Sequence, residues 1–157
     1  MAAQYSALPL TITTPLLTIS EQLAVQPGAT ITVPITFSAN GHNVAAAIFS
    51  IDYDERWLTF DSTDGDNNTI PDAIHFHAPA PFTASVMVNA ADHDGELDVV
   101  IADLAPPIAT LPDGILVEIV FQVGQPVETT EAAVRFSTAP AVSFSAPTGQ
   151  NIPLPTG

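Results

Sequence analysis

The sequence predicts an all-β protein that folds as a two-sheet β-sandwich. Apolar and polar residues alternate with a period of two in several runs, which places every second side chain on one face of a strand. Turns rich in Gly, Pro and Asp separate these runs. No window of helical length combines apolar residues at helical spacing with capping residues, so we expect no helix.

The first clear strand is expected within residues 29–38. Its apolar face would carry Ile31, Val33, Ile35 and Phe37. Pro34 lies on the other face and has no N–H to donate to a neighbouring strand. We therefore expect this strand, or part of it, to lie at the edge of a sheet.

The next strand is expected within residues 44–54, where alternation divides the side chains between two faces. The inward set would be Ala45, Ala47, Phe49, Ile51 and Tyr53. The outward row would be Ala46, Ile48, Ser50 and Asp52. Ile48 is the exceptional member of this outward row, because it is large and apolar.

Residues 85–104 are predicted to form a β-hairpin, because a polar turn at 92–95 that ends in Gly95 separates two runs rich in β-forming residues. Pairing back from this turn gives an inward face made of Val86, Val88, Ala90, Leu97, Val99 and Ile101. The opposite face would carry Met87, Asn89, Asp98 and Val100.

The remaining strands are expected after the proline-rich segment 105–114. In the run 115–124, Val117, Ile119, Phe121 and Val123 alternate with Leu116, Glu118, Val120 and Gln122. Two short runs, 132–137 and 141–145, complete the set.

Charge and composition exclude several classes of function. The 157 residues include 17 acidic and two basic ones, Arg56 and Arg135, for a formal net charge of −15. Such a surface repels polyphosphate, which excludes nucleic acid and anionic membranes as partners. The 46% of hydrophobic residues is enough for a packed core, so the chain is not a disordered acidic tail. The absence of cysteine excludes disulfides and thiol chemistry.

The length predicts one domain. We expect residues 1–15 to form a linker and the approach to the first strand, 16–155 to form the domain, and 156–157 to be the remnant of a second linker. Both ends carry the Pro and Thr typical of linkers. No apolar run is long enough to span a bilayer, and the N-terminus lacks the layout of a signal peptide. We expect a module of a larger secreted protein, located extracellularly or at the cell surface.

Three segments in a fixed order carry a family resemblance. They are GATITVPITFS (28–38), IFSIDYDERWLTFDST (48–63), and DGILVEIVFQVG (113–124) followed by AVSFSAPTGQNIPL (141–154). The middle segment has Tyr53-Asp54, a turn, and the apolar pair Trp57-Leu58. Their order and spacing resemble the cohesin domain of cellulosome scaffoldins and of related bacterial and archaeal surface proteins, and the similarity covers roughly residues 16–155.

This resemblance implies a jelly-roll-like sandwich of about nine strands and a non-catalytic function. Cohesins bind dockerins, small modules with EF-hand-like calcium loops, and so attach enzymes or other proteins to a scaffold or cell surface during polysaccharide degradation. The implied partner is a calcium-loaded dockerin. No cofactor is expected in this chain, since the calcium would lie on the dockerin.

The family's binding face is one sheet, equivalent here to residues 44–53, 84–90, 97–103 and 115–123. Its outward rows are the candidate partner-binding residues: Ala46, Ile48, Ser50, Asp52, Met87, Asn89, Asp98, Val100, Leu116 and Glu118.

This candidate face departs from one subtype of the family. Type I cohesins place an Asn and an Asp where this chain has Ala46 and Ile48. We therefore expect affinity to come from burying three apolar residues within an acidic rim that suits a dockerin presenting Lys or Arg. The apolar residues are Ile48, Val100 and Leu116, and the rim is Asp52, Asp98 and Glu118.

Residues 61–72, DSTDGDNNTIPD, resemble a calcium loop in composition. An EF-hand loop needs oxygen ligands at set positions and Gly at the sixth. Counted from Asp61, Gly65 falls one position early, and counted from Asp64 the sixth position is Thr69. A solvated turn is the favoured interpretation, with Asp64, Asp66 and Asn68 as the weak calcium candidates.

The remaining candidate metal ligands and catalytic residues do not indicate an enzyme. His75 and His77 share a strand face and could begin a zinc site, but the chain has no Cys, and its other histidines belong to other loops. Asp52, Asp54 and Glu55 could supply glycosidase carboxylates, although adjacent acids at a strand end more often form a turn. The motifs of serine hydrolases, zinc proteases and nucleotide-binding loops are absent.

A second function stays open at this point, namely a carbohydrate-binding or purely structural sandwich module of a secreted surface protein. A docking module predicts an apolar centre on a flat sheet. A sugar-binding module predicts an aromatic groove or a calcium-supported loop. Trp57 is the single tryptophan of the chain, which favours docking.

Overall fold

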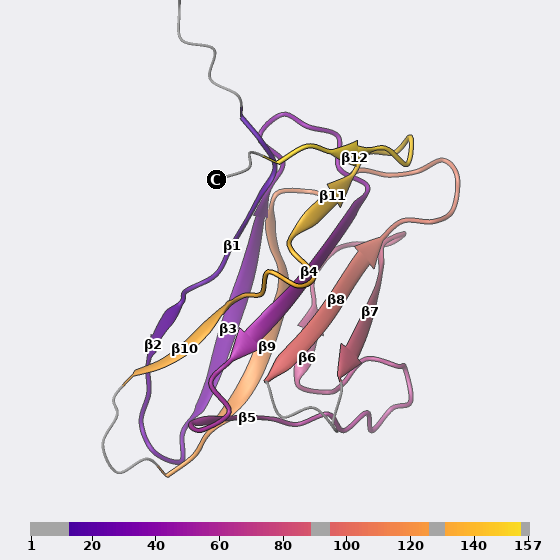
Figure 1. Ribbon diagram of the computed structural model, residues 1–157. Coiled ribbons are helices and arrows are strands. Elements are labelled where there is room, and N and C mark those ends of the chain that lie inside the picture. The colour runs from indigo at the N-terminus through magenta and orange to yellow at the C-terminus, as the bar shows by residue number, and fades with distance from the viewer. Residues whose placement is uncertain (1–12, 89–94, 126–130, 155–157) are drawn as a thin grey trace, which may run out of the picture.

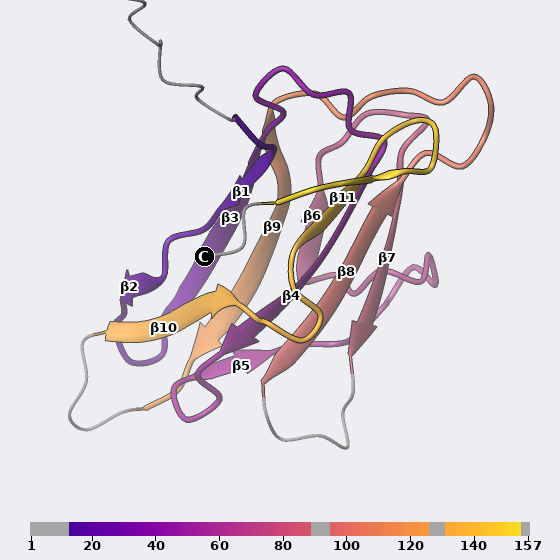
Figure 2. The same cartoon turned by 45° about the horizontal axis from the view of Figure 1, so that its top comes forward.

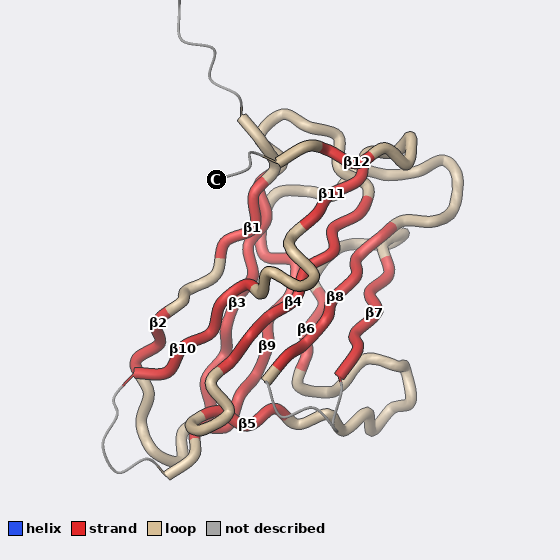
Figure 3. The backbone as a smooth tube through the Cα atoms, in the orientation of Figure 1, coloured by secondary structure: helices blue, strands red, loops and turns tan. Residues whose placement is uncertain are grey.

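The computed structural model describes residues 13–88, 95–125 and 131–154. This described part contains strands and no helix (Figure 3). It therefore has no helix that could cross a membrane. The strands are β1 (Leu16–Thr18), β2 (Gln22–Ala24), β3 (Thr30–Ser38), β4 (Ala46–Tyr53), β5 (Leu58–Phe60), β6 (Ile74–Phe76), β7 (Thr83–Val88), β8 (Glu96–Ala102), β9 (Gly114–Val123), β10 (Glu131–Phe136), β11 (Ser143–Ser145) and β12 (Asn151–Ile152).

The strands form two antiparallel sheets in two layers (Figure 1). In the first, which we call the β9 sheet, β3 and β9 pair along their length. β1 pairs with the end of β3 on its other side, and β5 and β6 pair with successive parts of β9. In the second, the β4 sheet, β8 and then β7 lie on one side of β4. On its other side, β11 and β10 pair with successive parts of β4 (Figure 2). β12 then pairs with β11, and β2 pairs with β10.

The all-β class and the two-sheet sandwich are thereby confirmed. The described residues form twelve strands, where about nine were expected. The additional ones are short, since β2, β5 and β6 have three residues each and β12 has two. Such short strands carry too few residues for alternation to be recognised in the sequence.

Alternation assigned the faces of β4 and of the hairpin strands correctly. Ala47, Phe49 and Ile51 are fully buried, whereas Ile48 between them is 37% exposed. In the hairpin, Val86 pairs with Val99, and Met87 pairs with Asp98, as the register predicted. Ala90 and the turn residues 92–94 lie outside the described residues.

Pro34 lies where its missing N–H has little consequence. β1 pairs with residues 36–38 of β3, so within the described part of the chain the one strand next to Pro34 is β9. This part of β3 is a sheet edge, which confirms the expectation drawn from the proline.

One prediction about the sheets is wrong. Residues 115–123 belong to β9, which lies in the opposite sheet from β4, β7 and β8. The register of β9 also shifts, so that Ile35 pairs with Val117 and Thr36 with Ile115. Leu116 lies at this irregularity and is 1% exposed, in the core beside Val117. Alternation defines the two faces of a strand but does not say which sheet the strand joins.

Aromatic pairs join the two sheets across the core. The rings of Phe37 on β3 and Phe144 on β11 lie 5.7 Å apart, and those of Tyr53 on β4 and Phe121 on β9 lie 5.0 Å apart. These separations are typical of favourable aromatic contacts. The core thus fixes the position of β4, whose other face points to solvent.

Asp103, just after β8, is a buried charge that stabilises a loop. It is 4% exposed, and its carboxylate accepts hydrogen bonds from the N–H groups of Ala105 (3.0 Å) and Ala109 (2.7 Å). Replacing Asp103 by Ala leaves both donors without this partner, so we expect a loss of about 1–3 kcal/mol in the free energy of unfolding. Urea denaturation measures this loss. Glu21→Ala, which removes one exposed acid, is the control, and equal stability of the two variants would contradict the role given to Asp103.

Candidate functional site

The outward side of the β4 sheet, formed by β7, β8 and β4, is the candidate site, and we call it the β4 face. The strand register arranges its side chains in rows across the three strands. The rows are Ala46–Ala102–Thr83, Ile48–Val100–Ser85, and Ser50–Asp98–Met87. Asp52 pairs with Glu96 at the end of the face.

The centre of the β4 face is apolar and open to solvent. Ile48 is 37% exposed and Met87 60% exposed, and the half-buried Val100 lies opposite Ile48. Cross-strand neighbours on one face lie in contact distance, so these side chains form one patch. An exposed apolar patch rimmed by polar residues is typical of a protein-binding surface.

Ser50 points to this face but is not accessible on it. Its side chain is 0% exposed, and its hydroxyl donates a hydrogen bond to Glu96 Oε1 at 2.7 Å. The expectation that Ser50 contacts a partner is therefore wrong, because its buried hydroxyl is not accessible to a binding protein. Ser50 instead orients Glu96.

Asp98 lies near the middle of the β4 face, between Ser50 and Met87. Its Oδ1 atom is buried and has no hydrogen-bond partner among the described residues. A buried acceptor without a donor is unfavourable. The face thus has one buried acceptor, on Asp98 next to the apolar patch, that lacks a donor among the described residues.

Leu116 and Glu118 do not belong to the β4 face. Leu116 is buried in the core, and Glu118 lies on the β9 sheet, where its Oε2 lies 2.7 Å from His77 Nε2. They cannot join Ile48 in one flat contact surface. Asn89, another predicted contact, lies outside the described residues.

Several residues of the face were not predicted from the sequence. Ser85 lies in the Ile48 row, and Ser143 on β11 pairs with Ile48 from the other side. Ser85 could have been found by extending the period of two back from Met87. Ser143 could not, because its pairing depends on a contact far along the chain.

Charged residues gather at the Asp52 end of the face. Arg135 on β10 pairs with Asp52, with Nε 3.3 Å from Asp52 Oδ2. In the following turn, Arg56 donates hydrogen bonds to both carboxylate oxygens of Asp54, at 2.8 and 2.7 Å. The hydrogen bond from Arg56 lowers the pKa of Asp54, and burial opposes this shift only in part. No sequence motif indicated this grouping.

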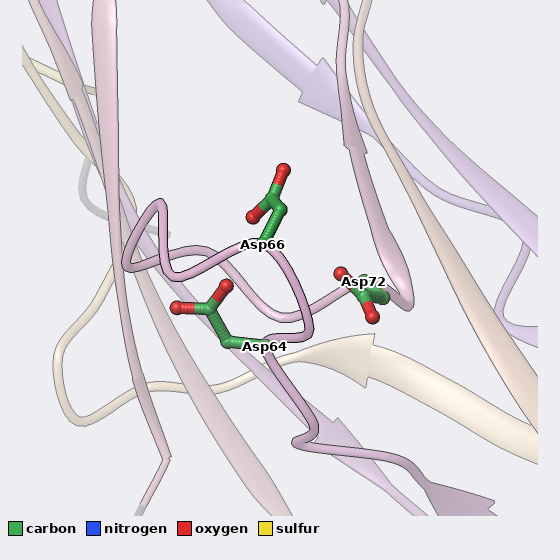
Figure 4. Close-up of side chains that lie close together, drawn as sticks. All are labelled: Asp64, Asp66 and Asp72. Carbon is green, nitrogen blue, oxygen red and sulfur yellow. The ribbon is translucent and has the colours of Figure 1, made fainter.

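The loop between β5 and β6 brings three carboxylates together (Figure 4). Oxygens of Asp64, Asp66 and Asp72 all lie within 4.8 Å of one another, so these three could hold a cation. Asp72 was not among the predicted calcium candidates. Asn68 was, but its side chain is engaged in the loop, donating to Asp66 and accepting from the N–H of Ile70.

The same carboxylates order the loop through backbone hydrogen bonds. Asp64 accepts from the N–H groups of Asn68 (3.0 Å) and Thr69 (2.8 Å), and Asp72 accepts from Gly65 (3.1 Å). Asn67 and Thr69 have positive φ angles of 58° and 74°. This geometry is that of a polar turn stabilised by Asp and Asn side chains, in agreement with the favoured interpretation of the segment.

These hydrogen bonds predict a pH dependence of stability. Burial raises the pKa of Asp64, but the N–H groups of Thr69 and Asn68 outweigh it, so its pKa lies below the ordinary 3.8. The unfolded chain then binds more protons near pH 4, and the stability from Asp64 is lost as the pH falls below that value. We expect the melting temperature of Asp64→Asn to fall less between pH 5 and pH 3 than that of the wild type. Glu21→Gln is the matched control, and an unchanged pH dependence in Asp64→Asn would contradict this account.

His75 and His77 lie at the edge of the β9 sheet, as expected. Both are exposed, and His75 pairs in register with Glu118, the residue that also contacts His77. Neither histidine belongs to a group of three potential metal ligands among the described residues. The group found there is the aspartate cluster of the β5–β6 loop. At this edge His77 forms a surface hydrogen bond with Glu118.

Comparison with solved structures shows what this fold is similar to. The sixth cohesin of scaffoldin B from Acetivibrio cellulolyticus, solved in complex with a Cel5 dockerin mutant, is 23% identical with a TM-score of 0.61, over 88% of this chain and 91% of that one. The second type II cohesin of the adaptor scaffoldin ScaA from the same organism is 14% identical with a TM-score of 0.63, over 90% and 85%. A type III cohesin of the cell-surface anchoring scaffoldin ScaE of Ruminococcus flavefaciens is 20% identical with a TM-score of 0.57, over 94% and 81%. At these identities the likeness establishes the fold.

The sequence itself shows the family. No curated protein sequence matches the chain. The family model of the cohesin domain, however, matches residues 16–149. This match extends from β1 to the turn after β11 and includes every strand of the β4 face. The chain therefore belongs to the cohesin family.

Proposed function

We propose that this chain is a non-catalytic docking module that binds a calcium-loaded dockerin through the β4 face. The observation that carries the proposal is the exposed apolar patch of Ile48, Val100 and Met87 on that face of a cohesin fold. A flat sheet with an apolar centre and a polar rim has the anatomy of a protein–protein interface.

The energetics of the patch suit this role. Burying one large apolar side chain contributes about 1.5–3 kcal/mol, so Ile48 and Met87 can supply a substantial part of a binding energy. The polar rim differs from the one expected, because Glu118 is on the opposite sheet. Asp52 and Glu96 form an acidic rim at one end of the face, and together with Asp98 nearer its middle they would attract basic residues of the dockerin.

The similar proteins support the choice of partner and location. The Acetivibrio cellulolyticus cohesin was solved in complex with a dockerin, and the Ruminococcus flavefaciens module belongs to a cell-surface anchoring scaffoldin. By analogy we place this chain in a secreted scaffold that anchors other proteins outside the cell. Calcium in the complex would lie in the loops of the dockerin.

Calorimetric titration tests the proposal. Purified dockerin modules from the same organism are titrated into the chain in calcium and again after chelation with EDTA. We expect at least one dockerin to bind with one-to-one stoichiometry and to lose binding after chelation. Absence of binding to every dockerin, combined with binding to a glycan array, would support the carbohydrate-binding alternative and overturn this proposal.

A further inference from the structure

A polar cleft continues the β4 face beyond the Asp52–Glu96 pair. Its volume is about 630 Å³. Its charged lining consists of both arginines of the chain and four acids: Arg56, Arg135, Asp52, Asp54, Glu55 and Glu96. A partner seated on the β4 face would lie next to this cleft, since Asp52 and Glu96 belong to both.

The charges in the cleft do not balance. Four carboxylates minus two guanidinium groups leave an excess of two negative charges. Arg56 is engaged with both oxygens of Asp54, whereas Arg135 contacts Asp52 through one nitrogen at 3.3 Å. Glu55 and Glu96 make no ion pair with a described residue. The two uncompensated groups are therefore Glu55 and Glu96.

The fold holds the Glu96 carboxylate in place and puts the exposed Glu55 side chain next to Gly95. The buried hydroxyl of Ser50 donates to Glu96 Oε1 at 2.7 Å, which leaves Oε2 available. Glu55 packs over Gly95, where an added Cβ would lie 2.8 Å from Glu55 Cγ and would also collide with the Tyr53 carbonyl oxygen. Because Glu96 is fixed before binding, it loses less entropy when a ligand arrives.

We propose that this cleft receives a positively charged Arg or Lys side chain of the docked partner, with Glu55 and Glu96 as its acceptors. The proposal rests on the proposed docking function. A guanidinium or ammonium group bound there would make charge-assisted hydrogen bonds to these carboxylates. Arg135 opposes this binding, because it adds a positive charge to the same cleft.

The geometry favours an organic cation over a metal ion. The carboxylates of the cleft do not form a group of three whose oxygens approach within 4.8 Å, as Asp64, Asp66 and Asp72 do in the described part of the chain. A bare cation needs such close ligands. A guanidinium group is larger and can bridge acceptors that stand further apart.

Nuclear magnetic resonance titration of the free chain tests the cleft without any dockerin. The probe is methylguanidinium, and N-methylurea is its neutral counterpart. We expect methylguanidinium, but not N-methylurea, to shift the signals of the residues around Glu96 and Glu55. The double variant Glu55→Gln/Glu96→Gln should bind the probe at least about fivefold more weakly, and Arg135→Gln at least about twofold more tightly.

The control is Asp66→Asn, which removes one negative charge outside the cleft. Glu96→Gln keeps an acceptor for Ser50, and Glu55 is exposed, so both substitutions are compatible with folding. If the double variant behaved like Asp66→Asn, or if Arg135→Gln weakened binding of the probe, the proposal would be overturned.

A second titration uses a dockerin that binds the wild type. The double variant should lower its affinity about tenfold and reduce the salt dependence of binding. Unchanged dockerin affinity would overturn the cleft proposal and leave docking intact. Binding of methylguanidinium without binding of any dockerin would instead overturn the docking function, while the cleft would still be a cation site.

Discussion

Replacing Ile48 by Asp is expected to abolish dockerin binding while the domain stays folded. Ile48 lies at the centre of the β4 face, between Val100 on β8 and Ser143 on β11. In a closed interface the new carboxylate would be buried without a partner, next to the row that holds the acidic Asp98. We expect an affinity loss of at least about 100-fold, which corresponds to about 2.7 kcal/mol, measured by calorimetry.

Ile115→Asp is the matched control for this experiment. Ile115 is 45% exposed, similar to Ile48, but it lies on β9 in the opposite sheet. The same change of charge and volume there should leave dockerin affinity unchanged. Retained affinity in Ile48→Asp, or equal losses in the two variants, would contradict the choice of face.

Replacing the neighbouring residue, Phe49, by Ala should cost stability instead of binding. Phe49 is fully buried, and its ring packs edge-on against Phe136 with centroids 6.0 Å apart. Truncation of a buried Phe leaves a cavity and removes this aromatic contact, so we expect a loss of about 3–5 kcal/mol in the free energy of unfolding. Urea denaturation followed by circular dichroism measures this loss.

The control is Ile48→Ala, one position away on the same strand. Because Ile48 is 37% exposed and faces solvent, its truncation should cost about 1 kcal/mol or less. The pair of variants separates the two faces of β4. Similar losses of stability at both positions would show that this strand is buried on both sides, and that no open docking surface exists there.

Local patterning explains why the faces of β4, β7 and β8 could be predicted from the sequence. Successive side chains of a strand point to opposite sides, so the alternation of Phe49 and Ile51 with Ile48 defines the exposed face without any knowledge of neighbours. The hairpin register of Met87 and Asp98 was equally local, since it follows from the turn that joins the two strands.

Pairing between distant strands explains what could not be predicted. β9 joins β3, about 80 residues earlier in the chain, and its apolar alternation would suit either sheet. The irregularity that buries Leu116 is visible only in the register. For this reason Leu116 and Glu118 were assigned to the wrong surface.

The charged groupings depend on the same long-range contacts. Arg135 and Asp52 are 83 residues apart in the sequence and meet because β10 pairs with β4. Asp72 joins Asp64 and Asp66 because the β5–β6 loop folds back on itself, with Asp72 accepting from Gly65. Neither the cleft nor the aspartate cluster follows a sequence spacing that a motif could describe.

Cross-saturation between a bound dockerin and the methyl groups of this chain tests the central claim most directly. With the dockerin protons saturated, the signals of Ile48, Met87 and Val100 should lose intensity, because these methyl groups lie on the β4 face. The signals of Leu16 and Ile115, which are exposed on strands of the β9 sheet, should keep theirs. Intensity loss at Leu16 and Ile115 with none at Ile48 would show that the dockerin binds the opposite sheet.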